Sequence, residues 1–145
     1  MTRADFYILA GQAQQDQWYF ACRLIEQVRG KGHRVLCQVN NEADARQLDE
    51  YMWQFRRDAF VPHALLTASD APVDCPVSIS WQSDPGHHHD VMINLCSELP
   101  AFFSRFERLV EIVVQNDGVL DYTRQHFRFL KDRGYPVTHQ DMRMS

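Results

Sequence analysis

The 145-residue sequence lacks several features that would assign a protein to a class at once. It contains no apolar run of about 18 residues, which excludes a transmembrane helix. Its start, MTRADFYILAGQ, has only a short apolar stretch, so we expect no secretory signal. Its four cysteines form no C-x-x-C pair, which argues against a zinc ribbon, a redox motif or a disulfide framework. We therefore expect a cytoplasmic protein with reduced, buried thiols and no membrane contact.

Signatures of catalysis and of nucleotide binding are also missing. The sequence contains no G-x-x-x-x-G-K-S/T loop, no G-x-G-x-x-G turn and no G-x-S-x-G nucleophile elbow. The glycines of Gly30-Lys31-Gly32-His33 follow a predicted helix and precede a predicted strand, which is the wrong side for a phosphate-binding loop. Asp49 and Glu50 are adjacent on a predicted helix and face different directions, so they do not form an acid–base pair. We predict no catalytic residue and no cofactor, and keep a small nucleotide-binding or hydrolytic enzyme as the alternative function.

A run of histidines, His87-His88-His89-Asp90, raises the question of a metal site, because His and Asp are good ligands for first-row metals. Consecutive residues of an extended chain point to opposite faces, so three adjacent histidines rarely converge on one ion. We predict a solvated loop here and no native metal site.

Hydrophobic periodicity predicts an α/β fold. Short apolar runs predict strands over 6–9, 35–39, 77–81, 90–95 and 109–114, and helical spacing of apolar residues predicts helices over 14–29, 42–53, 100–106 and 119–133. Strands that alternate with helices through short connections favour parallel pairing. We therefore predict a single domain over residues 1–145, with a three-layer, mostly parallel sheet and helices on both faces. This fold is Rossmann-like but has no phosphate-binding loop.

The charge is unevenly distributed along the chain. The net charge of −4 disfavours direct nucleic-acid binding, yet residues 124–133 alone carry +3, which leaves −7 elsewhere. Arg124, Arg128 and Lys131 form one stripe on the last predicted helix, beside Phe127 and shortly before Tyr135. The helix dipole accounts for a cation at the end of the helix but not for Arg124. This pattern predicts a site for a short acidic peptide that carries a hydrophobic residue.

A second candidate surface combines Trp53 with the segment Phe60-Val61-Pro62. Trp53 lies one position past the apolar stripe of the helix over 42–53, at the margin of its buried face. Pro62 cannot donate to a strand ladder, which is typical of an edge strand. Large aromatic residues at an edge anchor interfaces or complete the core, and the sequence leaves both interpretations open.

Taken together and in this order, six stretches resemble the chi subunit of bacterial DNA polymerase III holoenzyme. They are Phe6-Tyr-Ile-Leu, Arg34-Val-Leu, Leu48-Asp-Glu-x-x-Trp53, Phe60-Val-Pro-His63, Arg124-x-x-Phe-Arg128 and Gly134-Tyr135. The resemblance implies a nucleotide-binding-like fold without nucleotide chemistry or intrinsic catalytic activity. It also implies a heterodimer with the psi subunit and binding of the acidic, Phe-ended C-terminal tail of single-stranded DNA-binding protein. DNA would be reached only indirectly, through these partners.

The resemblance also implies roles for individual residues. Trp53, Phe60, Val61 and Pro62 correspond to the surface for psi, or for a helicase that competes with psi. The residues that correspond to the pocket for the acidic tail are Arg124, Phe127, Arg128, Gly134 and Tyr135. The sequence departs from the family at Leu120, often a lysine there, and at Phe127, which replaces a tyrosine. We therefore expect weaker tail binding, or binding shared with Lys131.

Overall fold

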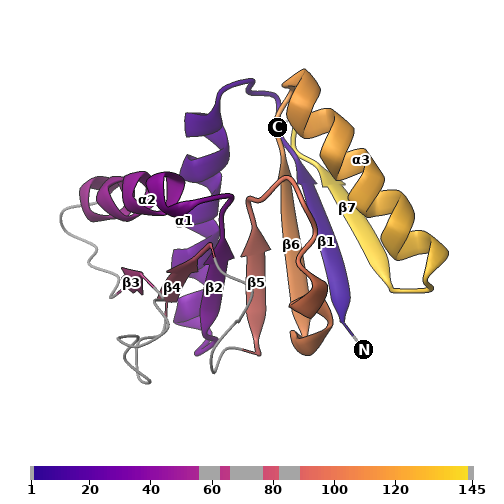
Figure 1. The fold of residues 1–145 in the computed structure, drawn as a ribbon, viewed down its shortest axis with the longest axis horizontal. Helices are drawn as coiled ribbons and strands as arrows, with labels where there is room; N and C mark the ends of the chain where they lie inside the picture. Colours follow the sequence, from indigo (N-terminus) through magenta and orange to yellow (C-terminus); the bar gives the residue numbers. More distant parts are fainter. Residues whose placement is uncertain (1, 56–62, 66–76, 82–88, 144–145) are drawn as a thin grey trace.

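A computed structural model describes residues 2–55, 63–65, 77–81 and 89–143 and contains one seven-stranded sheet (Figure 1). The strands are β1 (Arg3–Ile8), β2 (Val35–Gln38), β3 (His63–Leu65), β4 (Val77–Ser80), β5 (Val91–Asn94), β6 (Arg108–Val113) and β7 (Val137–Asp141). They lie in the order β3-β4-β2-β5-β6-β1-β7, and every neighbouring pair is parallel. Over the described ranges, no helix has the length and apolar character needed to cross a membrane.

The sheet separates two hydrophobic clusters, as expected for strands buried on both faces. Consecutive residues alternate between the clusters: Val35 and Cys37 belong to one, and Leu36 belongs to the other. The first cluster contains side chains of α1 (Gln14–Gly30) and α2 (Glu42–Phe55). The second contains side chains of the 3₁₀ helix η1 (Ala101–Arg105) and of α3 (Asp117–Asp132). This arrangement confirms the predicted three-layer α/β fold.

Strand β7 is the main element that the periodicity analysis did not predict. It pairs with β1 from Ala4↔Val137 to Ile8↔Asp141 and ends the sheet. Four of its five side chains are exposed, so its sequence shows no apolar alternation. Backbone hydrogen bonds to β1 hold the strand in the sheet, and a hydrophobic pattern in the sequence does not reveal such bonds.

Helix α3 begins at Asp117, earlier than the predicted start at residue 119. The reason is Asn116, whose side-chain oxygen accepts hydrogen bonds from the backbone N–H groups of Gly118 at 3.0 Å and Val119 at 3.3 Å. Asn116 is therefore the N-cap of the helix, and the Asn-Asp-Gly signal marks a helix start and not a separate turn.

The cysteines that the structure describes are free thiols, and two of them are buried as predicted, Cys22 and Cys37. Burial, assisted by the charge of Glu26, raises the pKa of Cys22 to about 12. A thiol with so high a pKa is unreactive at neutral pH and packs as a small apolar group.

A buried polar cluster fixes α3 on the sheet. Glu111 of β6 is only 1% exposed, and its two carboxylate oxygens face His126 Nδ1 of α3 at 2.7 Å and the Asn94 side-chain amide at 2.6 Å. The second ring nitrogen of His126 donates to the Ser97 carbonyl at 3.1 Å. Each polar group of the cluster thus has a partner, as burial requires. The cluster links β5, β6, the following loop and α3.

The cluster makes stability depend on pH. Burial raises the pKa of Glu111, against the opposing hydrogen bonds from His126 and Asn94. Burial alone would lower the pKa of His126, but the hydrogen bond and charge of Glu111 prevail and raise it. With both folded-state pKa values above those of the unfolded chain, folding favours the bound proton. The contribution to stability is therefore complete below the ordinary values of 4.5 for Glu and 6.5 for His, and it is lost as pH rises through the folded-state values.

We predict that His126→Gln lowers the free energy of unfolding by about 3 kcal/mol near pH 6, because it leaves a buried carboxylate without its cation. Urea unfolding measures this loss. The double variant Glu111→Gln, His126→Gln cannot titrate at either position and serves as the pH reference. The stability of the native chain relative to this double variant should fall as pH rises above about 4.5, where Glu of the unfolded chain loses its proton, and fall further above about 6.5 for His. Parallel pH curves for the two proteins would contradict the assignment.

Candidate functional site: two docking surfaces

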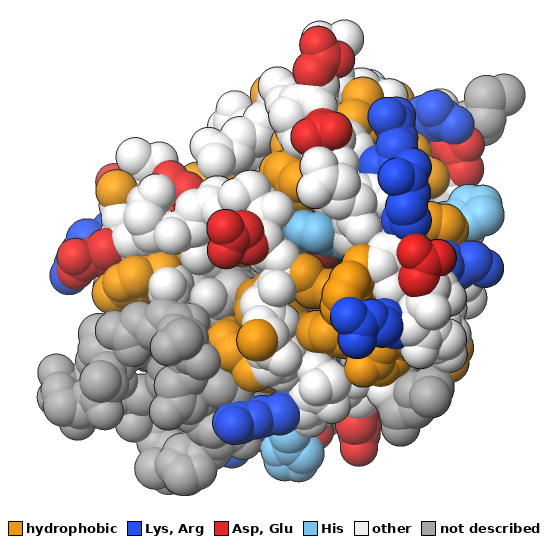
Figure 2. All heavy atoms as spheres, turned by 45° about the vertical axis from the view of Figure 1, so that its right-hand side comes forward, with side chains coloured by type: hydrophobic (Ala, Val, Ile, Leu, Met, Phe, Trp, Pro, Cys, Tyr) orange, Lys and Arg blue, Asp and Glu red, His pale blue; other side chains and the backbone are white. Residues whose placement is uncertain are grey.

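Helix α3 presents the predicted basic stripe to solvent. Thr123, His126 and Leu130 are the buried residues of the helix and face the sheet. Arg124, Arg128 and Lys131 are exposed on the outer side, as the helical spacing predicts. Figure 2 brings this side of the molecule forward and shows Lys and Arg side chains close to hydrophobic ones.

A cavity of about 320 Å³ lies between α3 and the β1–β7 end of the sheet, and we call it the α3 cavity. Its lining combines apolar side chains with two arginines and a histidine: Phe6, Ile8, Val113, Leu120, Arg124, Phe127, His139 and Arg143. The Phe127 ring meets Phe6 edge-on, with ring centroids 5.3 Å apart. Leu120, which replaces a cation expected from the resemblance, adds to the apolar lining.

The charges around the α3 cavity differ in how strongly they are already paired. Arg143 binds Asp141 through two hydrogen bonds of 2.6 and 2.8 Å, and these hold the pKa of Asp141 down at about 2. Arg124 forms no ion pair with any residue that the structure describes. The Lys131 ammonium lies 6.0 Å from the centroid of the Phe127 ring. Of the two arginines that line the cavity, Arg124 is therefore the more available to an anionic ligand.

The other predicted tail residues lie near the end of the helix. The backbone N–H of Gly134, which has φ +81°, donates to the Lys131 carbonyl. The backbone N–H of Tyr135 donates to the Leu130 carbonyl, and both hydrogen bonds are 3.1 Å. This pattern is a Schellman cap, which favours glycine at the left-handed position. The Tyr135 ring packs 5.1 Å from that of Phe103. Gly134 and Tyr135 thus end the helix, and Arg124 and Phe127 are the predicted residues that line the cavity.

Seven of the ten lining residues of the cavity were not identified from sequence, and two of the seven come from the end of the chain. His139 lies on β7, and Arg143 follows that strand. Both depend on the pairing of β7 with β1, which the hydrophobic pattern does not reveal. The one available signal for this strand was the pair of β-branched residues Val137-Thr138, which follows the helix-ending Gly134.

The second candidate surface is only partly described. Trp53 lies near the end of α2 and is 45% exposed, which favours the interface interpretation over the core interpretation for this residue. Phe60, Val61 and Pro62 lie outside the described residues. Strand β3, which starts at His63, forms the edge of the sheet on this side.

The region that holds phosphate in nucleotide-binding relatives of this fold has an acidic residue here. At the start of α1, the Asp16 carboxylate accepts a hydrogen bond from the Ala13 backbone N–H at 3.1 Å. A side chain at Gly11 would collide with this carboxylate. A negative charge at a helix N-terminus takes the place of an anionic ligand and repels one.

Metal binding finds no support either. His87 and His88 lie outside the described residues, and among those described no three His, Cys, Asp or Glu side chains are grouped to hold an ion.

The comparisons with known proteins agree on a family. The family described as "DNA polymerase III chi subunit, HolC" matches residues 1–138. The chain is 36% identical over 144 residues to the DNA polymerase III subunit chi of Pseudomonas aeruginosa, covering 99% of this chain and 98% of the relative. It is 29% identical to the subunit chi of Haemophilus influenzae, covering 96% of each chain.

A solved structure with a similar fold is titled "Mss116p DEAD-box helicase domain 2 bound to an RNA duplex", with a TM-score of 0.63 and 9% identity. The match covers 94% of this chain but only 62% of the helicase chain, and at this identity it shows the fold alone. The family match and the two close relatives, by contrast, cover almost the whole sequence, so the chain belongs to the DNA polymerase III chi subunit family.

Proposed function

We propose that the chain is a non-catalytic accessory subunit of the clamp-loader complex of DNA polymerase III. In this role it binds the acidic, Phe-ended C-terminal tail of single-stranded DNA-binding protein in the α3 cavity. The observation that carries the proposal is the combination of an apolar lining and Arg124 in one cavity on an otherwise acidic chain. The family supports the link to DNA replication.

The size and chemistry of the α3 cavity suit such a tail. A cavity of about 150 Å³ already holds benzene, so about 320 Å³ accommodates a phenylalanine ring together with part of its backbone. Arg124 can bind a carboxylate in a bidentate manner, and the exposed Arg128 and Lys131 continue the positive charge along the helix. The ring would enter the cavity, and the acidic residues before it would follow α3.

The Trp53 surface is proposed to bind the psi subunit, or a helicase that competes with psi. Trp53 belongs to α2, which packs on the face of the sheet opposite to α3. Partners on these two surfaces would not overlap, so one chain can hold psi and the acidic tail at once. This separation is what an adaptor between a clamp loader and DNA-coating protein needs. It leaves the chain in contact with DNA only through its partners.

We predict that Arg124→Glu weakens binding of a labelled acidic peptide ending in Asp-Phe by at least about tenfold, because a charge-assisted hydrogen bond is worth about 1.5–3 kcal/mol. Fluorescence anisotropy measures the affinity, which should also fall with added salt. The control is Arg46→Glu, the same charge reversal on α2. Equal affinities for the Arg124 variant and the native chain would place the peptide elsewhere.

We predict that Trp53→Ala abolishes co-purification with psi while the thermal unfolding midpoint falls only modestly, because 45% of the Trp53 side chain is already exposed to water. Phe129→Ala is the control, since Phe129 is 40% exposed and belongs to α3. Psi that still co-purifies with the Trp53 variant would exclude this residue as an interface anchor.

A further inference from the structure

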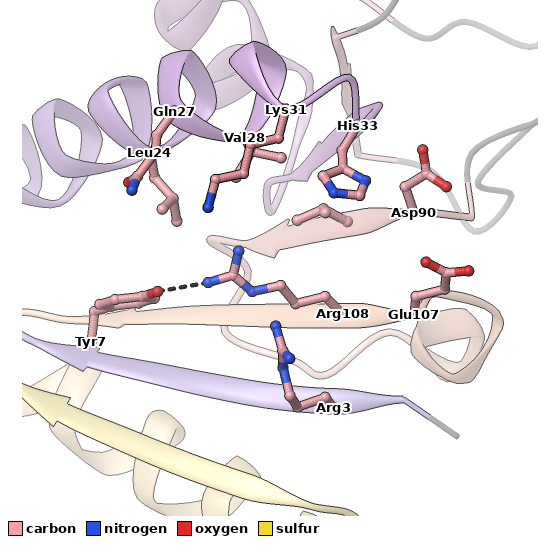
Figure 3. A pocket seen from close by; sticks show the side chains of 11 residues that line it. Arg3, Tyr7, Leu24, Gln27, Val28, Lys31, His33, Asp90, Glu107 and Arg108 are labelled. Carbon is pink, nitrogen blue, oxygen red and sulfur yellow. Dashed lines mark hydrogen bonds between the residues drawn. The ribbon is translucent and has the colours of Figure 1, made fainter.

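A second cavity, of about 530 Å³, lies on the face of the sheet that carries α1, and we call it the α1 cavity. It is bounded by the C-terminal half of α1 and by the starts of β1, β5 and β6 (Figure 3). Leu24 and Val28 of α1 form an apolar wall, while the strands contribute polar side chains. Neither docking surface described above includes this cavity.

Three cations from three parts of the chain point into the α1 cavity. Figure 3 shows Lys31 reaching in from the side of α1, opposite the guanidinium groups of Arg3 and Arg108. The last carbonyls of α1 are already bonded to backbone: the Lys31 N–H donates to Val28 at 3.1 Å, and the Gly32 N–H donates to Arg29 at 2.9 Å. The ammonium of Lys31 makes no ion pair with the described residues and is open to a ligand.

The two arginines share one buried carboxylate. Asp5 is 5% exposed and lies 2.6 Å from Arg108 Nε and 3.6 Å from Arg3 Nε. Three cations set against this single carboxylate leave a local excess of positive charge in the middle of the cavity, although the two carboxylates at its far end, Asp90 and Glu107, make the cavity neutral as a whole. A dianion would balance that excess.

The arrangement is also fixed in place before a ligand arrives. Arg108 Nη2 donates to the Tyr7 hydroxyl at 2.6 Å, while Nε is held by Asp5. Asp5 is held in turn by the Thr138 hydroxyl at 2.6 Å. A guanidinium fixed by two of its N–H groups loses little conformational entropy when its remaining donors bind phosphate oxygens.

The far end of the cavity has the opposite character. Asp90 and Glu107 lie there, just before β5 and β6, and both carry carboxylates (Figure 3). Carboxylates accept hydrogen bonds from hydroxyl groups and do not bind phosphate. We propose that the α1 cavity binds a small phosphorylated sugar or nucleotide, with its phosphate among Arg3, Lys31 and Arg108 and its hydroxyl groups toward Asp90 and Glu107. A volume of about 530 Å³ suits a ligand of this size.

Isothermal titration calorimetry tests the proposal. The whole chain is titrated with inorganic phosphate, with ribose 5-phosphate and with a 5′-phosphorylated oligodeoxynucleotide, and the three affinities are compared. We expect saturable binding of ribose 5-phosphate that is tighter than that of inorganic phosphate. Lys31→Gln and Arg3→Gln should each weaken it by about tenfold, as expected for one charge-assisted hydrogen bond. Both side chains are exposed, so these variants should fold normally. Lys31→Arg, which keeps the charge, should retain most of the affinity.

Two controls separate this site from general electrostatic attraction and from the α3 cavity. Arg105→Gln removes an exposed cation of η1 on the other face and should leave the affinity for ribose 5-phosphate unchanged. Lys31→Gln should leave binding of the acidic peptide unchanged. The proposal is overturned if ribose 5-phosphate does not bind, if Arg105→Gln weakens it as much as Lys31→Gln does, or if the oligonucleotide alone binds.

Discussion

The buried contact between Glu111 and His126 is the constraint on which the arrangement of the α3 face depends. A carboxylate in the middle of an interior strand must find partners, and it finds them in a side chain of β5 and in one of α3. Once His126 must face Glu111, the rotation of α3 about its own axis is fixed. Arg124 and Arg128 then point away from the core, and Phe127 falls over β1. The interaction that anchors the helix therefore also orients the surface that we propose for the acidic tail.

The sequence could predict the layers of the fold because they depend on side-chain burial. Periodic apolar residues located α1, α2, α3 and the interior strands to within a few residues. The exposure of the α3 cations also followed from helical spacing. What periodicity could not supply was β7, whose stability comes from backbone hydrogen bonds to β1. The candidate tail site was therefore predicted as a stripe on one helix, whereas the structure adds a strand and forms a cavity.

The two ends of α1 differ in the charge that surrounds them. At the N-terminus of α1, where open α/β folds often hold a nucleotide, the Asp16 carboxylate bonds to the backbone. At the other end of α1, side chains of Arg3, Lys31 and Arg108 bring positive charge to a cavity among the strand starts. Fold resemblance to a helicase domain thus says little about ligands, because binding depends on which side chains occupy each end of the sheet.

Strand β7 has a consequence for how the family can vary. Its main chain pairs with β1, while four of its five side chains are exposed to solvent. Apart from Val137, which packs on the core, and Thr138, which donates to the buried Asp5, substitutions there are expected to change stability by only about 0.5 kcal/mol. Two residues of the α3 cavity, His139 and Arg143, come from this strand and the residues just after it. The part of the α3 cavity best able to change its charge is therefore the part that folding constrains least, so the charge of the cavity can change without rebuilding the domain.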